Sequence, residues 1–290
     1  MKTRDIFDLT MVAALFGGAF LFMRVAAPAF GAIPLIAVRL VLAAMILMPI
    51  VLARNGMPEI VQHWRPITVL AILHYALPFC LFAYALLTLT GSFTAIINAS
   101  SPLFAGVVAW VWIGERLPPM RIAGLLIGFS GVVVLVWDKL DVNFNTAGIA
   151  TAAAVSASFC YGLAAVLAKK HLTGVSPLAV SAGSMLAGAI MLLPLAILLW
   201  PATAPSFNAW VMVAALGVAS TAVAFILYFR LIASVGPTKA ITVTFLVPVF
   251  AVVFGALLLD EPITLSMLAG GAVILLGTGL STGLLNLPAR

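Results

Sequence analysis

The sequence predicts an all-α integral membrane protein, with ten transmembrane helices arranged as two five-helix repeats of inverted topology. Composition is the first reason: 64% of the 290 residues are hydrophobic and 8% are charged, against roughly 25% charged residues in an ordinary soluble domain. The second is the length of the apolar stretches, because roughly 20 residues of helix cross a hydrocarbon core about 30 Å thick. The third is that the two halves of the chain resemble each other.

Ten apolar stretches follow one another through almost the whole chain, with short loops between them. They cover residues 9–28, 33–53, 66–88, 92–113, 121–137, 147–168, 177–199, 209–231, 237–259 and 265–285. The first imitates a signal peptide, because Lys2 and Arg4 precede it and small residues end it near Ala29. We expect a span instead, because the stretch is longer than the usual apolar core of roughly 7–15 residues, contains Arg24 and is followed directly by another.

The basic residues give the expected orientation. A net charge of +6 could suggest nucleic acid, but Lys and Arg are scattered singly over the loops, so we expect no nucleic-acid partner. With the N-terminus in the cytoplasm, one loop cation, Lys139, faces outward. Eleven face inward: Lys2, Arg4, Arg54, Arg65, Arg116, Arg121, Lys169, Lys170, Arg230, Lys239 and Arg290. The positive-inside rule therefore predicts cytoplasmic termini in a multi-pass protein of the plasma (inner) membrane.

A shift of 146 residues aligns the second half of the chain with the first. It pairs Pro102 with Pro248, Phe104 with Phe250, Ala105 with Ala251, Val107 with Val253, Glu115 with Glu261, Ala123 with Ala269, Gly124 with Gly270 and Gly131 with Gly277. With small gaps the match extends upstream to the pairs Tyr84 and Tyr228, Pro34 and Pro177, and Pro49 and Pro194. We expect one membrane domain made of a first repeat, residues 1–138, and a second repeat, residues 147–290.

An odd number of helices per repeat inverts the second copy in the membrane. Glu115 is then cytoplasmic beside Arg116 and Arg121, whereas its partner Glu261 is outside beside Asp260. Two antiparallel copies around a midplane site can exchange conformations and open alternately to each side, an arrangement typical of secondary transporters. The architecture therefore predicts alternating access.

A set of residues in the first half resembles the EamA-type ten-helix branch of the drug/metabolite transporter superfamily. They are Pro34, Arg39 and Ala43 in the second span, Tyr84 in the third, Pro102 in the fourth with Glu115 at its end, and Gly124 and Gly131 in the fifth. All but Arg39 recur in the second half, where Ala182 or a neighbour stands opposite it. The resemblance implies transport of small molecules without a cofactor, and the chain is most similar to bacterial exporters of aromatic and other neutral amino acids.

Pro102 and Pro248 stand near the middle of matching spans. An interior proline removes a helical hydrogen bond and clashes with the preceding turn, so both helices should kink there. Backbone groups freed at membrane depth are tolerated where protein or a water-filled cavity satisfies them, so the kinks point to a central cavity. The alternative is that they only bend the helices for packing.

Polar side chains at similar depth are candidates for substrate binding. They are His74, Tyr75, Asn98, Ser100, Ser101, Ser158, Tyr161, Ser184, Thr221 and Thr244. Serine and threonine often bond their own helix backbone, whereas Asn98 and His74 are costlier to bury. Tyr75 and Tyr161 could form an aromatic wall with Phe79 and Phe159, or simply belong to the core. The predicted substrate-binding set is His74, Tyr75, Pro78, Asn98, Ser101, Ser158, Tyr161, Thr244 and Arg39.

The charged residues give a sharper indication of the substrate. All eight acidic residues lie at or outside the ends of the predicted spans, whereas a cation-selective pump or carboxylate-driven antiporter is expected to keep a membrane-embedded acid. Arg24 and Arg39 lie within adjacent spans and Lys169 lies toward the inner end of the sixth. A positive interior favours a substrate with a carboxylate or another anionic group. The alternative is that these long side chains snorkel to the interface.

We therefore predict a monomeric secondary transporter that exports small metabolites, above all neutral or aromatic amino acids. A multidrug or other metabolite exporter and a lipid flippase remain alternatives. An enzyme is not expected, because paired intramembrane aspartates and the His-Glu-x-x-His pattern are absent from the sequence, and no metal-binding pattern occurs. His74, whose ordinary pKa is about 6.5, is expected to be a neutral polar contact in facilitated transport. Proton antiport through His74 and a plain structural role are the alternatives.

Overall fold

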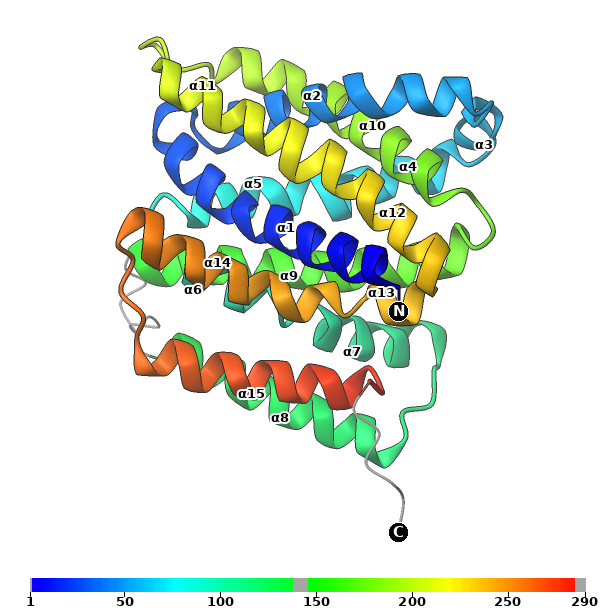
Figure 1. Cartoon of the computed structure of the whole chain (residues 1–290), viewed down its shortest axis with the longest axis vertical. Helices are drawn as coiled ribbons and strands as arrows, with labels where there is room; N and C mark the ends of the chain where they lie inside the picture. The colour runs from blue at the N-terminus through cyan, green and yellow to red at the C-terminus, as the bar shows by residue number, and fades with distance from the viewer. Residues whose placement is uncertain (1, 138–145, 285–290) are drawn as a thin grey trace.

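Ten helical segments run through the computed structural model, which describes residues 2–137 and 146–284 (Figure 1). Six are single helices: α1 (Thr3–Phe30), α2 (Ala32–Ala53), α8 (Pro119–Val136), α9 (Thr146–His171), α10 (Pro177–Leu198) and α15 (Leu265–Ser281). Eight of the ten are long and apolar enough to cross a bilayer, and the last two are shorter apolar helices. No strand occurs in the described ranges. The predicted all-helical membrane fold is confirmed, whereas Lys139 and Arg290 lie outside the described residues.

The other four segments are built from shorter pieces. They are α4 (Trp64–Leu70), η1 (Ala71–Ala76) and α5 (Leu77–Ala85); α6 (Gly91–Asn98) and α7 (Ser101–Ile113); α11 (Phe207–Ala214), η3 (Ala215–Val223) and α12 (Ala224–Val235); and α13 (Pro237–Ala240) and α14 (Val243–Leu259). One further helix, α3 (Met57–Gln62), lies in the loop before α4. Its six residues are too few to appear as an apolar stretch in the sequence.

The third and eighth segments each contain a π-helical stretch at matching positions. The shift of 144 residues that pairs Tyr84 with Tyr228 places the start of η1 on the start of η3. Pro78, which has no N–H to donate, lies in the first turn of α5 directly after η1. In η3 the Thr221 hydroxyl donates to the carbonyl of Leu216, at 2.7 Å. Such π-helical turns are frequent at functional sites, and hydropathy gives no sign of them.

The two repeat-related prolines lie in different local structures. Pro102 stands in the first turn of α7, after the helix has broken between Asn98 and Ser101, so a full break replaces the expected kink. A proline in the first turn of a helix costs no hydrogen bond. Pro248 lies inside α14, and the break in its span comes earlier, between α13 and α14. The predicted proline pair is therefore locally asymmetric.

Replacing Pro248 with Ala is expected to restore one backbone hydrogen bond inside α14 and to change the balance between outward-open and inward-open states. The measurement is labelling of single cysteines by a membrane-impermeant thiol reagent from each side. Pro194→Ala is the matched control, because Pro194 is also inside a helix, α10, but its side chain is exposed on the bundle surface. Equal labelling in the parent and both variants would mean that Pro248 only shapes packing.

The two repeats pack through equivalent helices. In Figure 1, α8 and α15 lie side by side along one edge, and α2 packs against α10. A Cβ added at Gly124 would meet the backbone of Gly277, and one added at Gly270 would meet the backbone of Gly131. Because these two contacts run in opposite directions along α8 and α15, the helices cross antiparallel. An inverted repeat requires this arrangement.

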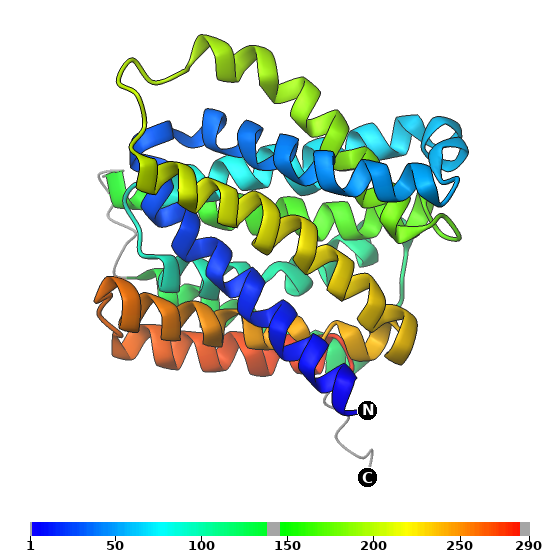
Figure 2. The ribbon, with the colours of Figure 1, turned by 45° about the horizontal axis from the view of Figure 1, so that its top comes forward.

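The first repeat is not separate from the second in space, because α1 crosses the bundle to reach α12 and α14 (Figure 2). The helix begins at Thr3, earlier than the expected residue 9, so Asp5 and Asp8 lie inside it and are buried. Asp8 pairs with Arg230 of α12, and Asp5 accepts a hydrogen bond from Ser234, at 2.6 Å. The expectation that no acid lies within a span is therefore wrong, because polar partners on α12 allow α1 to extend beyond its apolar stretch.

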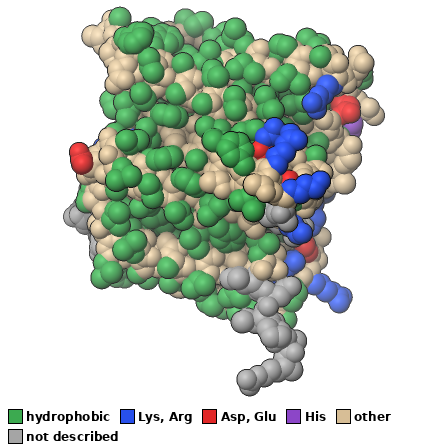
Figure 3. Space-filling view, in the orientation of Figure 1, with side chains coloured by type: hydrophobic (Ala, Val, Ile, Leu, Met, Phe, Trp, Pro, Cys, Tyr) green, Lys and Arg blue, Asp and Glu red, His purple; other side chains and the backbone are tan. Residues whose placement is uncertain are grey.

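Charged side chains lie near an end of the bundle, and its middle is hydrophobic. In the face shown in Figure 3, hydrophobic side chains cover the broad middle, and Lys and Arg gather near one end. The N-terminus, α3 and α13 lie at this same end in Figure 1. Arg54, Arg65 and Lys239 belong to the loops or short helices there. The distribution is the one that the positive-inside rule expects at a cytoplasmic face.

Candidate functional site

A cavity of about 620 Å³ lies between the two repeats. Its walls come from both halves of the chain: the first half supplies α1, α2, η1, α5, α6, α7 and α8, and the second half supplies α9, α12, α14 and α15. A volume in this range suits a small organic molecule, because ligand pockets usually measure roughly 300–1,000 Å³. The position between repeats is the one expected for a transport site in an inverted-repeat fold.

Among the described residues, the cavity wall reaches the loops at one end of the bundle. We call this end the mouth; six lining residues define it, namely Glu115, Leu117, Arg121, Lys169, Ser281 and Thr282. Over the described residues, the cavity wall includes none of the loops at the opposite end, which follow α1, α5 and α14. We call that opposite end the closed end. Over the described residues, the cavity therefore extends to the end that carries the basic residues.

Arg39 lies away from the mouth and contributes to the cavity wall. Its side chain is 4% exposed, so it does not snorkel to the interface. Nε donates to the Thr221 hydroxyl at 2.9 Å, and Cζ lies 3.7 Å from the centre of the Phe79 ring. Nη1 is 3.5 Å from the sulfur of Met23. No carboxylate of a described residue forms an ion pair with Arg39.

An unpaired buried guanidinium is a strong candidate for binding an anion. The planar group carries five N–H donors in a fork that matches a carboxylate, and Thr221 and Met23 use only part of this capacity. Contact with an aromatic face stabilises the cation by about 0.5–2 kcal/mol, which helps to keep it charged inside the protein. Arg39 can therefore offer its remaining donors to a carboxylate in the cavity.

Aromatic rings form the wall beside Arg39. His74, Phe79, Phe82 and Tyr161 all line the cavity. The His74 ring centre is 4.9 Å from that of Tyr161, and Tyr161 is 5.8 Å from Phe82. Phe159 does not join them, because it is on an exposed face of α9 and packs against Phe104. Alternate positions along a helix point in different directions, which separates Phe159 from Tyr161.

The remaining sequence-predicted residues divide into two groups. Asn98, Ser101, Thr244 and Pro102 line the cavity together with Arg39, His74 and Tyr161. The structure places the others outside its wall: Tyr75, Pro78, Ser158 and Pro248. Tyr75 is buried behind His74 and Phe79, with ring centres 4.7 and 5.7 Å away. It therefore supports the aromatic wall from behind.

Most of the hydroxyl groups bond to backbone carbonyls. Ser101 donates to Asn98 O at 2.7 Å, and Thr244 donates to Ile241 O at 2.8 Å. Ser158 lies 3.2 Å from the carbonyls of both Ile97 and Ala154. These bonds satisfy the broken backbone at the ends of α6 and α13. Ser101 and Thr244 line the cavity, and a hydroxyl that donates one hydrogen bond can still accept another. Ser158 instead holds α9 against α6.

Several lining residues were not predicted from the sequence. They include Phe16, Phe20 and Met23 of α1, Phe225 and Tyr228 of α12, and Ser281 and Thr282 at the end of α15. The apolar members look like any core residue in an apolar chain, so the sequence carries no signal for them. Tyr228 had a usable signal, because it belongs to the repeated pair with Tyr84, although Tyr84 itself is exposed.

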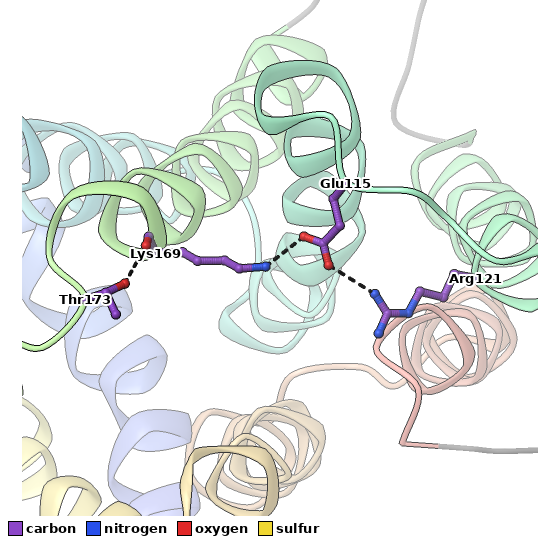
Figure 4. A network of polar contacts seen from close by, with 4 residues as sticks. All are labelled: Glu115, Arg121, Lys169 and Thr173. Atoms are coloured by element: carbon purple, nitrogen blue, oxygen red, sulfur yellow. Dashed lines mark hydrogen bonds and ion pairs between the residues drawn. The ribbon is translucent and has the colours of Figure 1, made fainter.

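At the mouth, two ion pairs of Glu115 link the end of α7 to α9 and α8 (Figure 4). Lys169 Nζ of α9 lies 2.8 Å from Glu115 Oε2, and Arg121 of α8 lies 3.4 Å from Glu115 Oε1. The Thr173 hydroxyl donates to Lys169 O at 2.6 Å, which fixes the end of α9. The hydrogen bond from Lys169 lowers the pKa of Glu115, so this carboxylate stays ionised at neutral pH.

The closed end is held by a different glutamate. Glu261 is 8% exposed, and its carboxylate accepts from the backbone N–H groups of Gly91 and Ser92 at 2.7 and 2.9 Å. The Ser92 hydroxyl adds a third hydrogen bond, at 2.5 Å. Three charge-assisted hydrogen bonds and the N-terminus of α6 therefore stabilise this buried carboxylate. The contact joins the loop after α14 to α6.

Comparison with known proteins assigns this architecture to a family. A model of the EamA-like transporter family matches residues 6–137 and 148–283. The transporter YvbV of Bacillus subtilis is 26% identical over 80% of this chain and 76% of its own length. A probable terminal-alkyne amino-acid exporter of Streptantibioticus cattleyicolor is 29% identical over 63% of this chain and 61% of its own.

A solved crystal structure shares the fold. It has a TM-score of 0.68 and 22% identity, and the match covers 95% of this chain and 96% of the other. The match spans nearly the whole of both chains, so the likeness extends to the complete ten-segment bundle. The two segments matched by the family model and this structural match together cover nearly all of the described chain. The protein is a multi-pass membrane transporter that belongs to the EamA-like transporter family.

Proposed function

We propose that this transporter exports small metabolites that join a carboxylate to an apolar or aromatic body, and that neutral and aromatic amino acids are its substrate class. The observation that carries the proposal is Arg39, a buried arginine without an ion-pair partner among the described residues, at the wall of a mostly aromatic and aliphatic cavity. When Arg39 binds the carboxylate of the substrate, the apolar body of the substrate packs against Phe79, Phe82 and Tyr161.

The charges of the cavity support an anionic group rather than a cationic one. Among the described residues, three cations line it, Arg39, Arg121 and Lys169, against one carboxylate, Glu115. Glu115 is already paired with the two cations at the mouth. Charges in a low-dielectric cleft attract the opposite sign strongly, so a substrate carboxylate is stabilised. This argues against the alternative of an exporter of cationic drugs.

Export is the direction that the open mouth supports. The mouth faces the end that carries Arg54, Arg65 and Lys239, which the positive-inside rule assigns to the cytoplasm. A substrate therefore enters the cavity from the cytoplasm, and release outside requires that the closed end open in turn. The related probable exporter of a terminal-alkyne amino acid supports the same class and direction.

Counterflow of labelled amino acids in proteoliposomes tests the proposal. Vesicles preloaded with unlabelled phenylalanine or leucine should take up the labelled compound transiently, and a panel of carboxylic acids, amides and amines of matched size ranks the substrates. A flippase moves a labelled phospholipid between leaflets instead and shows no counterflow. Absence of counterflow for every amino acid and carboxylic acid, in protein that is folded by gel filtration, would reject the proposed class.

His74 is expected to act as a polar contact, not as a proton carrier. It lines the cavity in η1, and none of the described residues forms a hydrogen bond with its ring. A neutral imidazole can donate one hydrogen bond and accept one. In proteoliposomes, an imposed pH gradient should not drive substrate above its equilibrium level, and His74→Gln should weaken transport of polar substrates by a few-fold.

The control for this prediction is His63→Gln, because His63 lies between α3 and α4, outside the cavity wall. Its ring nitrogen contacts Glu59 O at 3.0 Å, so its role is local. Accumulation above equilibrium that requires the pH gradient and disappears in His74→Gln, but not in His63→Gln, would show proton antiport instead.

A further inference from the structure

Two repeat-related glutamates occupy the same local backbone structure. Gly114 and Asp260 end α7 and α14 in the left-handed region, with φ of 65° and 52°. In each repeat the next residue is the glutamate: Glu115 N–H donates to Ala109 O at 3.2 Å, and Glu261 N–H donates to Gly255 O at 3.0 Å. The shift of 146 residues that pairs the glutamates also pairs these acceptors. The sequence therefore builds the same helix end twice.

The side chains of these two glutamates nevertheless have different partners. Glu261 is buried at the closed end on the first turn of α6, whereas Glu115 has a side-chain exposure of 32% at the mouth and pairs with Lys169 and Arg121. Because their backbones match, local structure does not explain the difference. The difference instead coincides with position, since Glu261 stands at the closed end and Glu115 at the mouth.

The packing of the helices agrees with this interpretation. At the closed end α6 packs against α14, and a Cβ added at Gly255 would overlap the Glu261 carboxylate and Ser92. The glycine therefore leaves room for the contact. At the mouth, the counterpart of Gly91 is Gly236, one residue out of register with the shift of 146. The counterpart of Ser92 is then Pro237, which has no N–H or hydroxyl to donate, so the next backbone N–H groups of this segment are those of Thr238 and Lys239. Among the side chains that the structure describes, Glu115 bonds to Lys169 and Arg121.

We propose that Glu261 and Glu115 are paired latches of the transport cycle, each of which closes one end of the cavity in turn. In the state described here Glu261 holds the closed end on Gly91 and Ser92. On switching, this latch releases, and Glu115 leaves Lys169 and Arg121 to hold the mouth closed against the segment that begins at Gly236. Lys169 and Arg121 keep Glu115 hydrated and ionised at the open mouth until then.

The magnitudes favour the latch as the dominant interaction of each glutamate. Glu261 receives three hydrogen bonds in a buried site, and a hydrogen bond to a charged group contributes more to stability than a neutral one. The ion pairs of Glu115 are partly exposed, and exposed pairs contribute little. Removing either carboxylate should therefore destabilise the state in which that glutamate is buried, more than the state in which it faces water.

Single-cysteine labelling tests the proposal without any substrate, so its outcome does not depend on the proposed substrate class. Ala19→Cys, in a chain whose Cys80 and Cys160 are replaced by Ala, places the reporter in the cavity wall. A membrane-impermeant thiol reagent is added to right-side-out or inside-out vesicles. Glu261→Gln should raise labelling from the closed end by about tenfold or more. This factor corresponds to the loss of one charge-assisted hydrogen bond from the state in which Glu261 is buried. Glu115→Gln should lower it.

Opposite signs for the two variants are the signature of paired latches. Asp260→Asn is the matched control: it removes the neighbouring carboxylate, keeps the left-handed backbone accessible and should leave labelling unchanged. Ser92→Ala removes one donor to Glu261 and should shift labelling in the direction of Glu261→Gln by a smaller factor, even where Glu261→Gln folds poorly. Unchanged labelling in the glutamate variants, a shift of the same sign in both, or an equal shift in Asp260→Asn overturns the proposal.

Discussion

Replacing Arg39 with Gln is expected to reduce the transport of carboxylate substrates by roughly 10- to 100-fold, the factor that corresponds to losing one or two charge-assisted hydrogen bonds. Amidated analogues of the same size should be transported nearly as well as by the parent, because they have no negative charge to lose. Glutamine keeps a polar group near Thr221, the present partner of Arg39. The measurement is the initial rate of counterflow for each member of a matched acid and amide pair.

Arg24→Gln is the control for this experiment, because Arg24 is the other arginine predicted within a span. It donates to the carbonyl of Leu86 and does not line the cavity. Its loss should lower transport of acids and amides by the same factor, through stability alone. Equal losses for acids and amides in Arg39→Gln would show that Arg39 is a structural residue. Protein abundance and gel-filtration profile separate both outcomes from misfolding.

The fold could be predicted from the sequence because two strong signals agree. Hydropathy marks the spans, since lipid requires about 20 apolar residues per helix, and the pairing of Glu115 with Glu261 reveals the inverted repeat. What hydropathy cannot show is the internal geometry of a span. The break before Pro102 and the π-helical turns of η1 and η3 lie inside apolar stretches and leave their length unchanged. They depend on which backbone groups find partners in neighbouring helices.

Sequence analysis could find those residues of the candidate site whose polar side chains are costly to bury in a membrane. Arg39, His74 and Asn98 stand out in an apolar chain, and all three line the cavity. Tyr75 and Ser158 looked equally polar but face other helices, because side-chain direction depends on helix rotation, which tertiary packing sets. Glu261 was expected outside the membrane, beyond the end of a span. Its burial follows from a contact with Ser92, 169 residues away, which no local pattern indicates.

Replacing Gly277 with Ala is expected to destabilise the protein, by about 1–3 kcal/mol, although alanine is the better helix former. The Cβ would lie 2.6 Å from the carbonyl oxygen of Gly124 and closer still to the backbone of Gly128. Backbone atoms cannot rotate away as a side chain can, so α8 and α15 must separate. In membranes, small residues make such close helix crossings possible. The measurement is the melting temperature in detergent, which should fall by several degrees.

Gly271→Ala on the same helix gives the matched comparison for this prediction. There the nearest atom to a new Cβ is the methyl Cγ2 of Ile96, at 3.3 Å, which can move. Higher helix propensity, worth about 0.8–1 kcal/mol, then offsets the tighter packing, and the melting temperature should stay unchanged or rise. Gly277→Val, with a larger side chain against the same backbone, should yield little folded protein. If Gly277→Ala matched Gly271→Ala, the crossing of α8 and α15 would be looser than the structure places it, and the antiparallel glycine contacts would not hold the repeats together.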